Sequence, residues 1–170
     1  MPANTTIDID GSEAVTTALL ELLNRFPGLK PGEKILFSTV PESGGIGFFP
    51  TSGAVYLRND EDITGHIKQL CQYPFIVVCR AGTQTEKQRL KIKEFLDTLG
   101  KWLERQPVTV NQTVRQLTEY PGLASGNREI RSISRTNPAH LNAADPDGME
   151  DWVISGALNY TNEFDRCATL

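Results

Sequence analysis

The stretch richest in glycine runs from Pro41 to Gly53 and is the first place to look for ligand chemistry. It contains Gly44-Gly45-Ile46-Gly47, but it lacks the Lys-Ser/Thr pair that completes a phosphate-binding P-loop. It also lacks the G-x-G-x-x-G spacing of a dinucleotide-binding turn. Glycine and proline recur every few residues, which predicts a loop. Because this loop also carries Ile46, Phe48 and Phe49, we expect an assembly contact formed by residues 44–49 and no phosphate cradle; the alternative is that Phe48 and Phe49 pack beneath their own domain.

The residue types that could bind a metal or act as acid and base are scattered. His66 and His140 are the only histidines, and neither has a second ligand at metal-site spacing. Four carboxylates surround a glycine near the end of the chain, but an EF-hand loop needs a longer run of oxygen ligands, so we interpret them as turn residues. These are Asp145, Asp147, Glu150 and Asp151. No nucleophile lies in a G-x-S-x-G elbow. We therefore expect no catalytic residue, metal or cofactor, although an acid–base pair that forms only in space stays open.

Composition places the chain among ordinary globular proteins. Its 170 residues suit one domain spanning 1–170. The net charge of −4 and pI of about 5.2 argue against sequence-specific nucleic-acid binding. Three cysteines without C-x-x-C spacing suggest neither a disulfide framework nor a zinc site, and we interpret Cys71 and Cys79 as small buried side chains in a reducing compartment. No signal peptide is visible, and the longest apolar run, Phe75 to Cys79, is too short to span a membrane, so we expect cytoplasmic synthesis.

Hydrophobic periodicity predicts two helices. The first covers about residues 12–26, where apolar side chains recur at helical spacing, with Asp10 and Glu13 as a capping box. The second covers about residues 84–105, with Thr83 and Glu86 as its capping box and a charged face opposite its apolar stripe.

Strands are predicted near residues 34–40, 54–58, 63–80, 128–136 and 150–162. The third is apolar on both faces around Phe75–Cys79, which indicates a central position in the sheet. In the last, the residues of one face are Trp152, Ile154, Gly156, Leu158 and Tyr160, and those of the other are Val153, Ser155, Ala157, Asn159 and Thr161, an alternation that predicts one half-buried face. Residues 108–123 could form a short helix, and residues 137–149 a loop closing on Asp-Pro-Asp-Gly. This order predicts an α+β fold, a mainly antiparallel β-sheet with helices packed on one face.

The predicted core draws on both helices and two strands. Its members are Leu19, Leu22, Phe26, Val77, Phe95, Leu99, Trp102, Ile154 and Leu158.

Three segments together resemble the tail-terminator, or minor capsid, family of siphophages and prophages of Gram-positive hosts. The first is Gln72-Tyr-Pro-Phe-Ile-Val-Val-Cys-Arg80, preceded by Ile63-Thr-Gly65. The second is the helical Lys93-Glu-Phe-Leu-Asp-Thr-Leu-Gly-Lys-Trp-Leu-Glu104. The third is Asp151-Trp-Val-Ile-Ser-Gly-Ala-Leu-Asn-Tyr160, preceded by Arg131-Ser-Ile-Ser-Arg135 and Asp147-Gly148. The similarity covers most of residues 54–162, whereas the first 50 residues match in layout alone.

The resemblance implies a structural virion protein of the tail, without catalysis or cofactor. Such a subunit caps the tail tube as a ring, usually a hexamer, and joins it to the head. Its partners would be other copies of itself, the major tail protein and a head-completion or neck protein. The alternatives are a small α+β enzyme or ligand-binding protein that shares only the layout, and another head–tail connector component.

Overall fold

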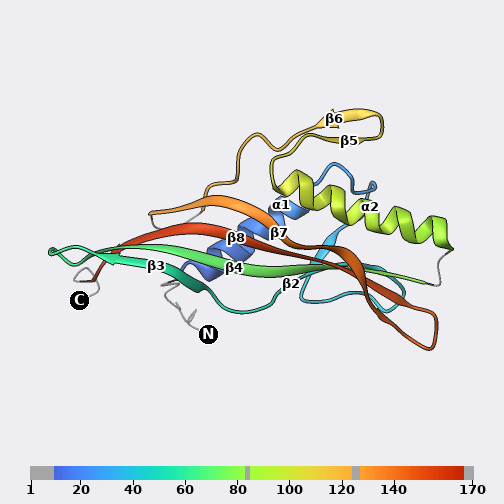
Figure 1. The fold of residues 1–170 in the computed structure, drawn as a ribbon, viewed down its shortest axis with the longest axis horizontal. Helices are drawn as coiled ribbons and strands as arrows, with labels where there is room; N and C mark the ends of the chain where they lie inside the picture. Colours follow the sequence, from blue (N-terminus) through green and yellow to red (C-terminus); the bar gives the residue numbers. More distant parts are fainter. Residues whose placement is uncertain (1–9, 83–84, 124–126, 167–170) are drawn as a thin grey trace, which may run out of the picture.

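The structure is a computed structural model that describes residues 10–82, 85–123 and 127–166. Within these ranges it contains two helices and eight strands (Figure 1). The helices are α1 (Ser12–Leu23) and α2 (Glu86–Leu103). The strands are β1 (Ile35–Phe37), β2 (Gly45–Pro50), β3 (Val55–Glu61), β4 (His66–Ala81), β5 (Val108–Val110), β6 (Thr113–Arg115), β7 (Asn127–Ala144) and β8 (Glu150–Asp165).

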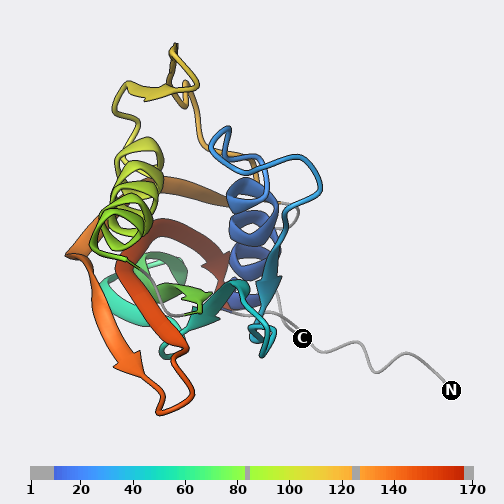
Figure 2. The same cartoon turned by 90° about the vertical axis from the view of Figure 1, so that its right-hand side faces the viewer.

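Six strands form one mixed sheet in the order β1-β2-β4-β8-β7, and β3 pairs with the first half of β4. Every pairing in this sheet is antiparallel except the one between β1 and β2. Figure 2 shows α1 and α2 side by side over one face of the curved sheet, with the β5–β6 hairpin beyond them. The predicted α+β fold with a mainly antiparallel sheet is confirmed.

Strand β4 is the central strand and pairs with β8 along its whole length, from His66 to Ala81. On its other side, β3 pairs as far as Gln72 and β2 begins at Phe75. Pro74 lies between these two stretches, and its carbonyl accepts a hydrogen bond from the Thr51 N–H at 3.1 Å. A proline is tolerated in this central strand because its missing N–H falls where the neighbouring strand changes.

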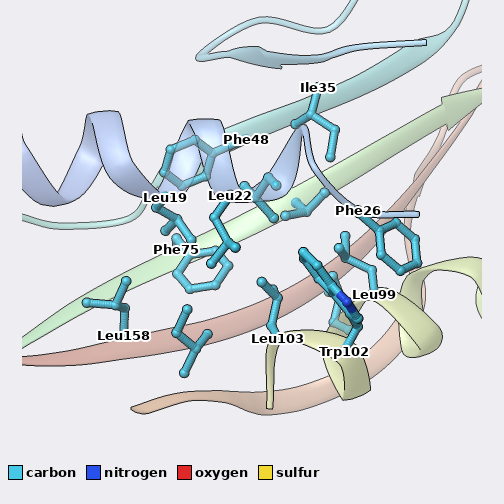
Figure 3. Packing of buried hydrophobic residues seen from close by; sticks show 14 of the residues in the cluster. Leu19, Leu22, Phe26, Ile35, Phe48, Phe75, Leu99, Trp102, Leu103 and Leu158 are labelled. Carbon is cyan, nitrogen blue, oxygen red and sulfur yellow. The ribbon is translucent and has the colours of Figure 1, made fainter. Parts of the chain in front are cut away.

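The helices meet over the sheet in one apolar core (Figure 3). The Phe26 ring, just beyond α1, packs at a tilt on Trp102 and edge-to-face on Phe95 of α2, with ring centroids 5.5 and 5.6 Å away. All nine predicted core residues belong to this cluster; eight are buried, and Phe95 is partly buried. The period of 3.6 in the helices and of 2 in β8 therefore identified the core-facing sides correctly.

Both predicted helix caps need correction. The cap of α2 is Thr85, whose side chain accepts from the Gln88 N–H while the Gln88 side chain accepts from the Thr85 N–H. The predicted cap, Thr83, lies outside the described residues. Helix α1 starts from Gly11 in a left-handed conformation and has no side-chain capping bond. The Asp10 carboxylate instead accepts from the Ser12 N–H at 2.9 Å, which stabilises the turn before the helix.

Two loop predictions were wrong, and one ambiguous segment is decided by the structure. Residues 41–53, predicted as a loop, contain β2, which pairs with β1 on one side and β4 on the other. Residues 108–123, which the sequence left ambiguous with a short helix as one possibility, contain the β5–β6 hairpin. Residues 137–149 continue β7 as far as Ala144, opposite Glu150. Pro138 fits there because β7 is an edge strand with irregular pairing between Asn137 and His140.

Candidate assembly surface

The glycine-rich segment that was predicted to form an assembly contact is largely part of the core. Ile46 and Phe48 are buried, and the Phe48 ring contacts those of Phe37, Tyr73 and Phe75. Burial removes both side chains from any partner-facing surface. Phe49 points to the other face of the sheet and is partly exposed, so its role as a contact stays a prediction.

The glycines of this segment have conformational and packing roles. Gly44 has φ +112°, and its N–H donates to the Pro41 carbonyl at 3.1 Å, closing the turn into β2. Gly45 follows it and pairs with Arg80 of β4. At Gly47 a Cβ atom would lie 2.3 Å from the Thr39 carbonyl oxygen, so only glycine allows this backbone approach.

The carboxylates near the end of the chain do not form one site. Asp145 closes the turn between β7 and β8, where its carbonyl accepts from the Gly148 N–H at 2.9 Å. Glu150 is buried and accepts from the Arg89 guanidinium of α2 at 2.9 Å, which lowers the pKa of Glu150. Asp151 receives two hydrogen bonds from Arg80, at 2.7 and 2.9 Å, which lower the pKa of Asp151. These pairs fasten α2 and β4 to β8.

The two histidines lie far apart on the sheet. His66 starts β4, and its Nδ1 lies 2.6 Å from the carboxylate of Asp165 at the end of β8; this hydrogen bond raises the pKa of His66. His140 pairs with Val153, near the start of β8. About a dozen residues of strand separate the two positions, which is on the order of 40 Å. His66 and His140 are therefore too far apart to bind one metal ion or to act on one substrate together.

Thiols and carboxylates also form no metal site in the part of the chain that the structure describes, since no group of three His, Cys, Asp or Glu residues is placed to hold an ion. Cys71 is buried, as predicted for a free thiol. Cys79 is partly buried at the end of β4, and burial raises its pKa to about 11. Cys167 lies outside the described residues. None of the described helices is long and apolar enough to cross a bilayer.

Exposed apolar side chains gather instead on β3 and its turn into β4. Within β3, Val55, Tyr56 and Leu57 are 42%, 52% and 50% exposed. This strand pairs only with β4 among the described strands, so its other edge presents unpaired backbone groups. Ile63, in the turn, is fully exposed. The sequence predicts strands here, but no pattern in it indicates that their apolar side chains remain outside the core.

A cleft of about 520 Å³ lies towards the opposite end of the molecule, between α2, the end of β4 and the turn after α1. Its apolar lining comes mainly from Ile46, Ile92 and Phe95, and Cys79 lies beside them. Two lysines, Lys30 and Lys91, line it as well. These residues come from four separate segments, so no sequence motif could reveal the cleft.

Comparisons with known proteins found no relative of this chain in either of two searches. Neither a scan against protein-family models nor a search of curated proteins found a match for this chain.

Proposed function

We propose that this chain is a structural virion protein, the tail-terminator subunit that caps a phage tail tube as a ring, with six copies as the expected number, and joins the tube to the head. The proposed working location is the virion tail, and the proposed partners are further copies of the chain, the major tail protein and a head-completion or neck protein. No catalytic step and no cofactor belong to this proposal.

The observation that carries the proposal is the exposed apolar edge strand β3. Val55, Tyr56 and Leu57 are consecutive and each about half exposed. The rest of the strand, Arg58–Glu61, is polar and charged, and its pairing with β4 is irregular after Tyr56, so the exposed apolar surface is confined to Val55–Leu57. In an assembly, a neighbouring subunit can pair with the free edge of β3 and bury its exposed apolar side chains. The edge strand would then be part of the contact between subunits.

The arrangement of the segments that carry the family resemblance also supports the proposal. The Tyr-Pro-Phe segment lies in β4, the second segment lies in α2, and the last is β8. Arg80, which ends the first segment, is joined by two hydrogen bonds to Asp151, which begins the last. Buried side chains of all three segments also belong to one core, among them Phe75, Leu99 and Leu158, so the three segments pack against one another.

The test is deletion of the gene from the phage or prophage that carries it, followed by electron microscopy of the induced particles. Without a cap, nothing stops tube polymerisation or joins the tube to a head, so tubes of irregular length and separate heads are expected. Restoring the gene should restore whole particles, and averaging should show a closed ring of copies at the head-proximal end. Normal joined tails after deletion, or a single-copy density, would refute the proposal.

A pair of substitutions connects this test to β3. Leu57→Ser changes a half-exposed side chain of the apolar edge, whereas Val114→Ser changes a similarly exposed side chain in the β5–β6 hairpin. Both variants should fold, because surface substitutions usually change stability by less than about 0.5 kcal/mol. Only Leu57→Ser should fail to restore particles. Equal rescue by the two variants would show that the β3 edge has no part in assembly.

A further inference from the structure

The turn between β3 and β4 presents a rigid apolar tip. Ile63 is fully exposed there. The Asp62 carboxylate beside it accepts hydrogen bonds from the backbone N–H groups of Thr64 and His66 at 2.8 and 3.0 Å, and from the Thr64 hydroxyl at 2.6 Å. Gly65 closes the turn at φ +83°. Because these bonds already fix the turn, binding through Ile63 would lose little conformational entropy.

The carboxylates around this tip differ in their partners. Asp60 pairs with Arg58 at 2.6 Å, and Glu61 with Arg166 at 3.2 Å. Asp62 receives hydrogen bonds from neutral donors, which lower its pKa and keep it ionised. The tip therefore combines an apolar side chain with an adjacent negative charge.

The cleft at the other end has the complementary composition. Ile46, Ile92 and Phe95 give it apolar walls. Arg80 also lines it and pairs with Asp151, whereas Lys30 and Lys91 form no ion pair with any described residue. Glu33 is the one carboxylate in the lining, and it accepts from the Lys30 backbone N–H at 3.3 Å. At about 520 Å³ the cleft falls in the size range that can bury most of a small ligand, so an isoleucine with its turn would fit.

A chain cannot place its own tip in its own cleft. The tip precedes the first residue of β4, and Cys79 lies near the end of that strand. Thirteen residue steps from His66 to Cys79 at roughly 3.3 Å each give a separation of about 43 Å. Figure 1 shows the β3–β4 turn at one extreme of the long axis and the end of β4 towards the other. The occupant of the cleft must come from another molecule.

We propose that the β3–β4 turn of one copy inserts Ile63 into the cleft of the next copy, placing Asp62 near Lys30 and Lys91. The contact is heterologous, since the two surfaces lie on different parts of the chain, and repeating it closes a ring when the rotation between copies allows. This inference rests on the proposed ring-forming function and names the surfaces that would form it.

A cross-link tests the contact directly. Ile63→Cys puts a thiol at the tip, Cys79 supplies one in the cleft, and Cys167→Ser removes the thiol outside the described residues. The purified protein at its highest soluble concentration, and tails assembled with it, are treated with copper phenanthroline at about pH 9, where more of the Cys79 thiol is ionised. Each disulfide forms as two thiols pass two electrons through copper to oxygen and release two protons.

The expected product is a ladder of disulfide-linked multimers, because every copy carries one tip and one cleft. Peptide mapping should join residue 63 to residue 79, and Cys79→Ala should abolish the ladder. A 63–79 link must be intermolecular given the separation along β4. Absence of this link in both the concentrated protein and the assembled tails would overturn the inference.

A charge exchange gives a second measurement that does not depend on thiol reactivity. Ile63→Lys would put a cation at the tip, opposite the two lysines of the cleft, and should weaken self-association and tail rescue at least tenfold. Lys30→Glu with Lys91→Glu should weaken both through repulsion from Asp62. Combining all three changes should recover much of the loss. Unchanged association and rescue by Ile63→Lys, or a small molecule found in the cleft of the native protein, would refute the contact.

The results separate this inference from the proposed function. If the 63–79 link forms but deletion of the gene leaves tails normal, the contact stands and the tail function falls. If tails require the chain but no link forms in them, the tail function stands and the contact falls.

Discussion

Replacing Phe48 by alanine should strongly destabilise the fold. The side chain is fully buried, and its ring centroid lies 5.7, 6.4 and 5.8 Å from those of Phe37, Tyr73 and Phe75. Truncating a buried phenylalanine costs about 3–5 kcal/mol, and three aromatic neighbours favour the upper part of that range. At roughly 2–4 °C per kcal/mol for a chain of this size, a loss of about 4–5 kcal/mol should lower the melting temperature by about 8–20 °C.

Phe49 is the matched control, because it is adjacent in sequence but points to the other face of β2. It is partly exposed, so Phe49→Ala should cost only about 1–2 kcal/mol. If both rings instead belonged to a loop that becomes ordered only on a partner, neither truncation would change the stability of the isolated protein. The contrast between the two variants therefore separates a strand in the core from a contact loop.

The assay is thermal and urea unfolding of each isolated variant, monitored by far-ultraviolet circular dichroism and tryptophan fluorescence. Trp102 packs on Phe26 in the core and reports on tertiary packing. A loss below about 1 kcal/mol for Phe48→Ala, or a larger loss for Phe49→Ala than for Phe48→Ala, would refute the assignment of Phe48 to the core.

Two further predictions concern single polar contacts. Thr85→Ala removes the capping box of α2 and should lower the free energy of unfolding by about 0.5–2 kcal/mol, measured by urea titration; no change would mean that the cap is not formed in solution. Arg80 lowers the folded-state pKa of Asp151, so the pair stabilises the fold above the unfolded carboxyl pKa of about 3.9, and this stabilisation is lost as the pH falls through the lowered folded value. Asp151→Asn should therefore cost about 1–3 kcal/mol at neutral pH and flatten the acid side of a stability–pH profile, and an unchanged profile would contradict the pairing.

Much of the fold could be predicted because its signals are local. The apolar stripe around Leu19 and Leu22 has helical spacing, and the alternation from Trp152 to Tyr160 has strand spacing. Each pattern states which side of its element must be buried, and the structure buries those sides. Turn signals were equally local: the Asp145–Gly148 turn lies where its residues predicted it.

The errors occurred where a neighbouring strand decided the conformation. Glycines in residues 44–47 indicate a loop when read alone, but Gly44 supplies a turn with positive φ, and Gly47 lets the Thr39 carbonyl approach. Pairing with β1 and β4 then makes the segment a strand. Strand β7 likewise continues past Pro138 because β8 lies beside it. Propensity is a weak guide in such segments, because cross-strand packing and hydrogen bonding outweigh it.

By itself, the sequence determined the periodic elements, the fold class and the core. Each of these follows from the spacing of apolar residues within a short stretch of chain, because the apolar side of an element must be buried. Only the tertiary structure decided which apolar side chains remain exposed and where the surface forms a cleft. The exposure of Ile63, the apolar edge of β3 and the cleft beside Cys79 depend on which segments pack over which, and the cleft is built from residues between Gly28 and Phe95. The β3–β4 turn and the cleft lie at opposite ends of β4, and this separation exists only in the folded chain. It is the reason that the proposed contact joins two copies.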